Sequence, residues 1–153
     1  MKKSFPNIRL RRLRANSSIR NLVRENVLSP FDLIQPLFVI EGKNKIEKIR
    51  SMPSITRMSI DNIVKEVKVL KKLGIQAIAL FPYISKKLKN LSGSESYNQK
   101  GLIQNCIQEI KDKVNDMIII SDIALDPYTS HGQDGILDKN GKILNDETIE
   151  ILV

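Results

Sequence analysis

Two stretches of the chain carry apolar residues at helical spacing. The first has them at Ile63, Val64, Val67, Leu70 and Leu73. The second has them at Leu102, Ile103, Cys106, Ile107, Ile110 and Val114. A period of three to four residues predicts two amphipathic helices, each with one face against a core. Ser59 is placed to cap the first helix, and Gly74 is placed to end it as the C′ residue.

Short continuous apolar runs alternate with these helices. One run extends from Ile75 to Phe81 and is closed by Pro82, a second covers Met117 to Ile120, and a third lies near Leu37. Runs of this length predict buried strands. Strand, helix and strand at this spacing form a βαβ unit, in which the strands pair in parallel. We therefore predict an α/β fold.

The segments outside these elements have their own patterns. Ser85 to Asn98 is polar and reads as a loop. The pairs Ile136-Leu137 and Ile143-Leu144 flank an Asn-Gly turn, which predicts a small hairpin. The run from Asn145 to Thr148 predicts a helix start, because its acids suit the positive end of the helix dipole.

Candidate chemistry is concentrated between Ser121 and Gly135. Three acids, Asp122, Asp126 and Asp134, follow the apolar run, and His131, the only histidine in the chain, lies among them. Open and barrel α/β proteins place their active sites at the carboxyl ends of such strands. Asp and Gly are also ordinary turn residues, so this spacing alone does not define a reaction.

The segment Asp122–Gly135, DIALDPYTSHGQDG, resembles the signature loop of the 5-aminolevulinate dehydratase family, also called porphobilinogen synthase. Other stretches resemble the same family, in order, along nearly all of the chain. They are Arg11–Arg14, Leu22–Glu25, Asp32–Val39, Glu41-Gly42, Ser51–Pro53, Leu80–Pro82, Gly93–Glu95 and Leu144–Thr148. An ordered series of matches is more specific than any single motif.

The resemblance implies the first part of a TIM (β/α)8 barrel with an extended N-terminal arm. We expect residues 1–30 to form the arm and residues 31–153 to form the N-terminal portion of the catalytic domain. Such a barrel takes about 250 residues, and the helix that starts at Asn145 reaches Val153 without a C-terminal cap. We therefore expect roughly the first half of a barrel enzyme, truncated at Val153.

The resemblance also implies an activity. The family condenses two 5-aminolevulinate molecules to porphobilinogen in heme and chlorophyll biosynthesis, a hydro-lyase reaction. Two active-site lysines each form a Schiff base with one substrate, which requires a deprotonated amine. The family pattern places both lysines beyond Val153, and Lys86, Lys87 and Lys89 here lie in a polar loop. We therefore expect the 153-residue chain alone to be inactive.

The resemblance gives supporting catalytic roles to Asp122, Asp126 and Asp134. Asp122 could assist proton transfer, while the other two could order water and balance the positive Schiff bases and the substrate amine. Zinc-dependent members carry three cysteines in this loop, where this chain has Ala124, Asp126 and Asp134. Thiolates suit Zn²⁺ and carboxylates suit Mg²⁺. We expect no Zn²⁺, no metal ligand in this chain, and an allosteric Mg²⁺ site in the remaining part of the enzyme.

Three further residues are candidates for the substrate pocket: Phe81, Ser130 and His131. Phe81 is either a core residue or part of the pocket floor. His131 either acts on the substrate or holds the loop by hydrogen bonds. The family pattern commonly has a second histidine where this chain has Gln133, and Gln cannot titrate, so an acid–base role at that position is in doubt.

The net charge of +8 is confined to one end of the chain. Eight basic residues and no acids precede Glu25, which leaves 17 basic residues (25 − 8) and 17 acidic residues in the rest. The basic residues are Lys2, Lys3, Arg9, Arg11, Arg12, Arg14, Arg20 and Arg24. Three alternatives fit: a nucleic-acid-binding arm, an organelle transit peptide, or an arm that docks on another subunit.

The docking arm is the alternative that the resemblance implies, because family members form dimers that assemble to octamers. Apolar residues interleaved with the charges, at Ile8, Leu10, Leu13, Ile19, Leu22 and Val23, suit such an arm. We expect a homo-oligomer that binds neither nucleic acid nor membrane. The competing hypothesis is a basic nucleic-acid-binding module that uses the segment Lys2–Arg24.

The remaining composition fits a cytoplasmic protein. No window approaches the ~18 consecutive apolar residues of a membrane helix, and no apolar signal-peptide core follows Met1. The single cysteine, Cys106, excludes an internal disulfide and a thiolate metal cluster. Its position on an apolar helical face predicts a buried small hydrophobic residue.

Overall fold

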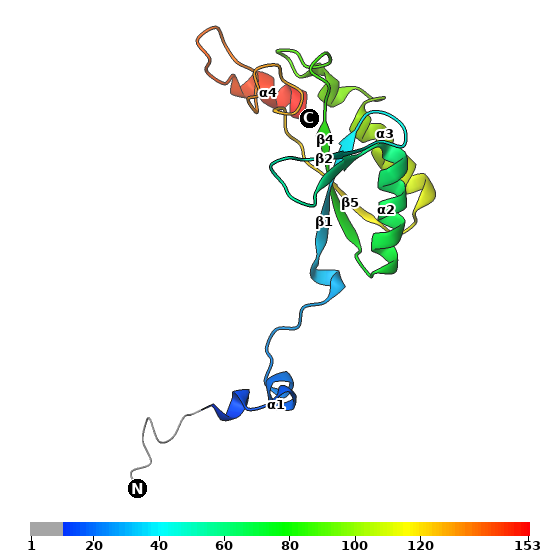
Figure 1. Cartoon of the computed structure of the whole chain (residues 1–153). Coiled ribbons are helices and arrows are strands. Elements are labelled where there is room, and N and C mark those ends of the chain that lie inside the picture. Colours follow the sequence, from blue (N-terminus) through cyan, green and yellow to red (C-terminus); the bar gives the residue numbers. More distant parts are fainter. Residues whose placement is uncertain (1–10) are drawn as a thin grey trace.

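The computed structural model describes residues 11–153 and contains an α/β unit with an extended N-terminal arm (Figure 1). Three strands of its sheet pair in parallel: β1 (Ile34–Ile40), β4 (Ala77–Tyr83) and β5 (Ile118–Ser121). Helices α2 (Ile60–Lys72) and α3 (Leu102–Lys113) connect them. The chain therefore runs β1–α2–β4–α3–β5, with consecutive strands side by side, which is the order of a (β/α) barrel.

Two short strands extend the sheet beyond β1. Strand β2 (Ile46–Lys48) pairs antiparallel with β3 (Thr56–Met58), and β3 pairs parallel with the carboxyl-terminal part of β1. The order in the described sheet is β2-β3-β1-β4-β5. The apolar pattern of the sequence did not predict β2 and β3, because three residues are too few to display a period.

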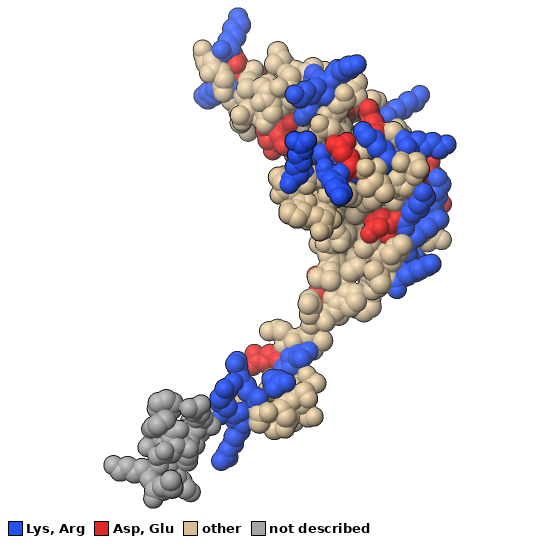
Figure 2. All heavy atoms as spheres, in the orientation of Figure 1, with Lys and Arg blue, Asp and Glu red and all other residues tan. Residues whose placement is uncertain are grey.

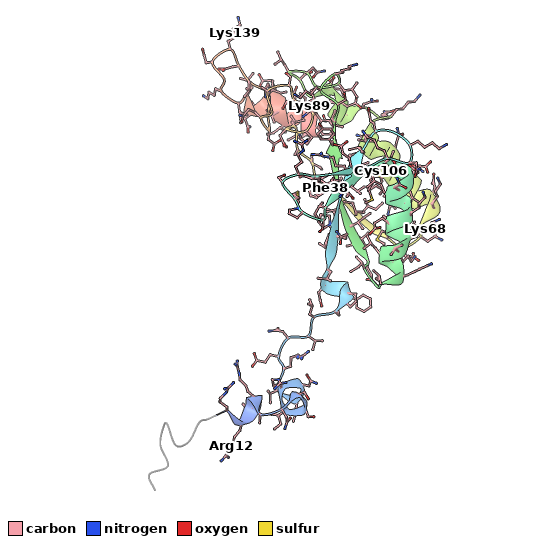
Figure 3. The ribbon with its side chains drawn as sticks, viewed as in Figure 1. Arg12, Phe38, Lys68, Lys89, Cys106 and Lys139 are labelled. Carbon is pink, nitrogen blue, oxygen red and sulfur yellow. The ribbon has the colours of Figure 1, made fainter. Side chains whose placement is uncertain are left out.

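Helices α2 and α3 cover one face of the sheet and bury the core (Figure 1). Side chains of alternate strand residues meet apolar side chains of both helices there, and the largest fully buried ones are Ile63, Ile78, Leu80, Ile110, Val39 and Val67. Cys106 lies within this layer, whereas Lys68 points outward from α2 (Figure 3). Burial, with a smaller effect of Glu109, raises the pKa of the Cys106 thiol to about 12. The prediction that Cys106 is a buried small residue is confirmed.

The other face of the sheet is apolar but carries no helix among residues 11–153. Residues that alternate with the core positions point to it, so Ile118 remains 58% exposed and Ile120 41% exposed. Phe38 and Phe81 pack against each other on the same face, with their ring centroids 5.6 Å apart. In a closed barrel this face is the packed interior, which explains its apolar character.

The ends of α2 follow from particular residues. Ser59 is the N-cap residue, but its hydroxyl makes no capping bond: it donates to Asp61 and accepts from the backbone N–H of Lys45. At the other end Gly74 has φ +89°, and the N–H groups of Gly74 and Ile75 donate to Lys71 and Leu70. This is the Schellman arrangement. Because Ile75 completes it, strand β4 begins two residues later than predicted, and it continues through Pro82.

Strand β5 is followed by a loop, a small hairpin and helix α4 (Asn145–Leu152). Leu137 and Ile143 form the antiparallel bridge of the hairpin, and Gly141 adopts φ +80° in its turn, as the Asn-Gly pair predicted. Gly135 is needed where the hairpin meets the loop, because a Cβ there would lie 2.8 Å from Ile143. Thr148 joins α4 to the hairpin by accepting the N–H of Ile136.

The arm projects away from the α/β unit (Figure 1). It contains η1 (Arg12–Arg14), helix α1 (Ser17–Leu22) and η2 (Pro30–Asp32). Basic side chains gather around α1 and over the outer side of α2 (Figure 2). The predicted arm residues Lys2, Lys3, Ile8, Arg9 and Leu10 lie outside the described part of the chain. None of the helices between residues 11 and 153 is long and apolar enough to cross a membrane.

Candidate active site

The register of the strands places a row of side chains across the open face at the carboxyl-terminal rim of the sheet. Arg57 on β3 is level with Phe38 on β1, which is level with Phe81 on β4. Leu80 is level with Ser121, so the next residue, Asp122, follows in line with Phe81. The carboxyl-terminal rim of a parallel sheet is where barrel enzymes hold their catalytic groups.

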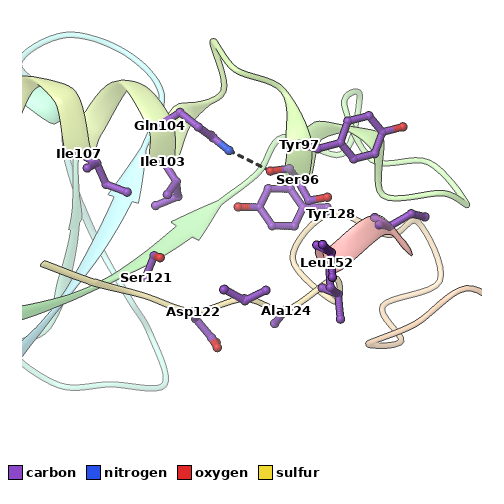
Figure 4. Close-up of a pocket in the computed structure, with 13 residues that line it drawn as sticks. Ser96, Tyr97, Ile103, Gln104, Ile107, Ser121, Asp122, Ala124, Tyr128 and Leu152 are labelled. Atoms are coloured by element: carbon purple, nitrogen blue, oxygen red, sulfur yellow. Dashed lines mark hydrogen bonds between the residues drawn. The ribbon is translucent and has the colours of Figure 1, made fainter. Parts of the chain in front are cut away.

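Asp122 lies where β5 ends, and its side chain is turned toward the open face. Ser121 points toward Ile103 of α3, whereas Asp122 points the opposite way (Figure 4). This is the alternation expected along an extended chain. Asp122 is exposed and makes no hydrogen bond to any described residue, so its carboxylate is available to a ligand.

The loops that follow β4 and β5 are joined to each other. The backbone of Asn90 donates to the Tyr128 carbonyl at 3.3 Å and accepts from the Ser130 N–H at 2.9 Å. The Asn90 side chain also organises its own loop, because its Oδ1 accepts from the Ser94 N–H and from the Ser92 hydroxyl. These bonds fix the loop with the predicted acids relative to the neighbouring strand.

Asp134 closes the loop after β5. Its Oδ1 accepts the backbone N–H of Leu125 at 2.6 Å, and the Leu125 side chain is fully buried. The Thr129 hydroxyl donates to the Gln133 carbonyl at 2.8 Å within the same loop. A hydrogen bond from a backbone N–H to a carboxylate is strong because it is charge-assisted. Asp134 therefore positions the loop, a role that the sequence did not predict for it.

His131 also has a structural contact. Its Nδ1 accepts the backbone N–H of Gln133 at 3.1 Å, so in the neutral ring the proton is on Nε2. The Nε2 atom is buried and has no hydrogen-bond partner among the described residues. This contact agrees with the alternative in which His131 holds the loop by hydrogen bonds. Ser130 is exposed, and its backbone takes part in the bridge to Asn90.

The three predicted acids do not gather into a metal site. Asp126 is exposed and makes no hydrogen bond to a described residue, while Asp134 is occupied by Leu125. Across residues 11–153, no three or more His, Cys, Asp or Glu side chains are placed to hold a metal ion. The Ala124 side chain has no donor atom for a metal ion.

A cavity of about 290 Å³ lies on the helical side of β5 (Figure 4). It is walled by η3 (Ser94–Tyr97), α3, the end of β5 and the last residues of α4. Tyr128 is buried beside it, and burial, followed by Glu95 and Asp122, raises the pKa of the Tyr128 phenol to about 12. The phenol therefore stays protonated through the physiological range and can serve as a hydrogen-bond donor but not as a base.

Phe81 is not part of the buried core: it is half-buried and lies on the open face against Phe38. In a closed barrel this face is the interior, so both alternatives for Phe81, core residue and pocket floor, stay predictions. Sequence reasoning also missed Arg57 and Tyr83, which stand in the same part of the rim. Only the register of the short strand β3 reveals them, since a single Arg in a three-residue strand has no pattern.

Comparison with known proteins identifies close relatives. The family model for delta-aminolevulinic acid dehydratase matches residues 7–153. A delta-aminolevulinic acid dehydratase of Bradyrhizobium diazoefficiens is 47% identical over 146 residues, which cover 95% of this chain and 41% of the relative. One of Chlamydia pneumoniae is 48% identical over 143 residues, 94% of this chain and 43% of the relative.

A solved structure has the same fold. The delta-aminolevulinic acid dehydratase (porphobilinogen synthase) of Toxoplasma gondii, in complex with the reaction product porphobilinogen, superimposes with a TM-score of 0.89 at 42% sequence identity. The similarity covers 95% of this chain and 41% of that one. The predicted fold class, the first part of a TIM barrel, is confirmed. The chain spans about two fifths of the length of the relatives that it matches.

The contact between Asp134 and Leu125 generates a prediction about loop stability. Asp134→Ala leaves the Leu125 N–H without its acceptor, which should lower the free energy of unfolding by about 1–3 kcal/mol. The Leu125 amide should also exchange faster with deuterium. Asp134→Asn, which keeps an acceptor oxygen, should lose less. Asp126→Ala is the matched control and should leave both quantities unchanged. Equal urea midpoints and equal Leu125 exchange in the two alanine variants would contradict this role.

Proposed function

This chain belongs to the delta-aminolevulinic acid dehydratase family, and we propose that the protein acts in the condensation of two 5-aminolevulinate molecules to porphobilinogen with release of water. The observation that carries the proposal is 47% identity over 95% of the chain to a protein of that name. The rim of the sheet supports it, because an exposed carboxylate, Asp122, stands there beside an aromatic surface.

The residues of this chain form one wall of the proposed site. Asp122 is placed to accept or donate a proton at the end of β5. Phe38 and Phe81 form an apolar floor that excludes water and strengthens electrostatic interactions above it. Asp126 brings negative charge to the same loop, where it offsets the positive charge of the substrate amine and of protonated Schiff bases.

The Schiff-base lysines of the reaction are proposed to lie outside this wall. A lysine that forms a Schiff base needs burial or a neighbouring cation to lose its proton. The lysines between residues 11 and 153 are exposed, apart from Lys89, which is half-buried (Figure 3). This exposure supports the proposal that the Schiff-base lysines belong to the part of the relatives that this chain does not match.

For the metal, we propose that no Zn²⁺ takes part and that Mg²⁺ acts at a site away from the loop after β5. The donor set is the reason: Ala124 has no ligand atom, and Asp134 is already bonded to Leu125. Carboxylates and water suit Mg²⁺ better than Zn²⁺. No step at the sheet rim is assigned to a metal ion.

For the arm, we propose docking on a second copy of the chain. Apolar side chains of the arm are exposed in the isolated chain, with Leu22 85%, Leu28 77% and Val27 71% accessible. Burial of such surface supplies the main drive for protein association. Nucleic-acid binding would use the arginines of the arm instead. Subunit docking therefore depends on the apolar side chains, and nucleic-acid binding depends on the basic ones.

The activity prediction compares two polypeptides. The whole gene product should form porphobilinogen from 5-aminolevulinate, measured colorimetrically, whereas residues 1–153 alone should form none. Borohydride reduction in the presence of substrate should trap a covalent adduct on the whole gene product only, because the lysines that form the Schiff base are proposed to lie in the part of the relatives that this chain does not match. Turnover or stoichiometric trapping on residues 1–153 would place the lysines in this chain.

The metal prediction concerns the same whole gene product. Its activity should survive a Zn²⁺-selective chelator and should rise on addition of Mg²⁺, since the loop offers carboxylates rather than thiolates. Metal analysis of the purified protein alongside the assay provides the control. The proposal would be refuted if each subunit bound at least one Zn²⁺ ion tightly and if turnover required that ion.

The arm prediction uses two matched variants of the whole gene product. A variant with Leu22, Val27 and Leu28 changed to Ser should have a lower mass by light scattering and a lower turnover, because it removes apolar contact surface. A variant with Arg11, Arg14, Arg20 and Arg24 changed to Gln should keep most of both. The opposite result, with intact assembly in the Ser variant and loss of salt-sensitive RNA or DNA binding in the Gln variant, would make the arm a nucleic-acid contact.

A further inference from the structure

The hairpin between β5 and α4 carries the pair Asn140-Gly141 in its turn. Lys139, the residue before this pair, marks the outer end of the hairpin, which projects beyond α4 (Figure 3). Asn140 and Gly141 are both exposed. Asn140 is also the only asparagine in the sequence that a glycine follows.

An asparagine followed by a glycine can react with its own backbone. The glycine nitrogen attacks the side-chain carbonyl carbon of the asparagine, gives its proton to solvent and expels ammonia, which leaves a five-membered succinimide ring. Water then opens the ring at one of its two carbonyl groups. The product is aspartate, or isoaspartate, in which the main chain runs through the side-chain carbon. Glycine favours the attack because it has no Cβ beside the nitrogen.

The structure leaves both reacting groups of this pair unobstructed. The backbone N–H of Asn140 donates to Asp138 Oδ1 at 2.8 Å, but the Asn140 side chain makes no hydrogen bond to any residue between 11 and 153. A Cβ placed on Gly141 would meet no atom within 4 Å. The side-chain carbonyl is therefore free to rotate toward the glycine nitrogen, and the space around that nitrogen is open.

Asp138 restrains the turn without closing it. Its Oδ1 accepts the N–H groups of Asn140 and Lys142, each at 2.8 Å, and its carbonyl accepts the Gly141 N–H at 3.1 Å. The bond from Gly141 must break before its nitrogen attacks. Exposed turns with few buried contacts open by local fluctuation at a small free-energy cost. Asp138 therefore slows the reaction and does not prevent it.

The loop after β5 contains a second pair of the same type in a protected form. Asp134-Gly135 can form the same ring with loss of water instead of ammonia. However, Asp134 Oδ1 is held by the Leu125 N–H at 2.6 Å. A Cβ on Gly135 would lie 2.8 Å from Ile143 and 3.2 Å from the Thr148 hydroxyl, so the space beside that glycine is filled. The fold closes one reactive pair and leaves the other open.

We propose that Asn140 is a site of spontaneous covalent modification, at which the side-chain amide converts to isoaspartate and aspartate through a succinimide formed with Gly141. Water is the only co-reactant. Isoaspartate lengthens the main chain of the turn by one methylene and adds a negative charge beside Asp138. Because the turn sets the register of a hairpin, we expect the modified hairpin to lose the bonds from Lys142 to Asp138 and from Leu144 to the Ile136 carbonyl.

The first test follows three side chains in the whole gene product during incubation at mildly alkaline pH. Peptide mass analysis should show Asn140 converting from amide to acid, and isoaspartyl methyltransferase should label the same peptide. Asn16 is the internal control, because its Oδ1 accepts the Ile19 N–H at 2.9 Å, and it should remain an amide. Asp134 should form isoaspartate in urea but not in the folded protein.

Two variants test the restraint and the reacting group. Asp138→Ala should convert Asn140 faster by roughly 10-fold, because the N–H groups of Asn140 and Lys142 lose their acceptor and the turn opens more often. Asn140→Gln is the matched control. It should show no conversion in the same period, because the longer side chain would have to close a six-membered ring.

Hydrogen exchange tests the structural consequence. In the isolated isoaspartate form the amides of Lys142 and Leu144 should exchange faster than in the unmodified protein. Freshly purified Asn140→Asp, which has the added charge but the normal main chain, should keep slow exchange at both. If the isoaspartate form also keeps slow exchange, the expected loss of the hairpin bonds is wrong.

Three results would overturn the proposed site. The first is conversion of Asn140 that is no faster than conversion of Asn16. The second is isoaspartate at Asp134 that forms as fast in the folded protein as in urea, since the fold would then protect neither pair. The third is an unchanged rate in Asp138→Ala, which would remove local opening of the turn as the controlling step. None of these measurements uses turnover, so their outcome is separate from that of the proposed function.

Discussion

The packing of α2 and α3 on one face of the parallel strands is the interaction on which the rest of the molecule depends. Ile63, Val67, Ile78, Leu80 and Ile110 are almost entirely removed from water there, and each such side chain contributes about 1.5–3 kcal/mol through burial. The helices return the chain to the same end of the sheet each time, so the strands run in parallel. The carboxyl-terminal ends of the parallel strands, which bear the polar side chains, therefore meet at one rim.

Register then decides which side chains share that rim. A shift of one residue in β4 would turn Phe81 toward the helices and Leu80 toward the open face. With the observed pairing, Phe81 meets Phe38, and Asp122 emerges beside them from β5. The loops add precision, because the bonds between Asn90 and the Tyr128–Ser130 segment prevent the acidic loop from moving independently of β4.

The sequence predicted the periodic parts of the fold well. Both long helices, three parallel strands and the Asn-Gly hairpin were anticipated, because apolar spacing and turn chemistry specify them locally. It did not predict β2 and β3, whose three residues each carry no period, nor the contact between Arg57 and Tyr83, which depends on how distant strands align. Asp134 illustrates the same limit: its residue type suggested chemistry, whereas its bond to Leu125 depends on the path of the loop.

Strand β5 carries a further consequence for how the polypeptide must be handled. Its outer edge is unpaired within the described sheet, and Ile118, Ile119 and Ile120 carry no charge that would discourage another strand from adding there. Natural sheets usually protect such edges with Lys, Pro or a bulge. When residues 1–153 are refolded alone at high concentration, this edge is therefore a template for strand addition between molecules, and the yield of folded monomer is expected to fall as concentration rises.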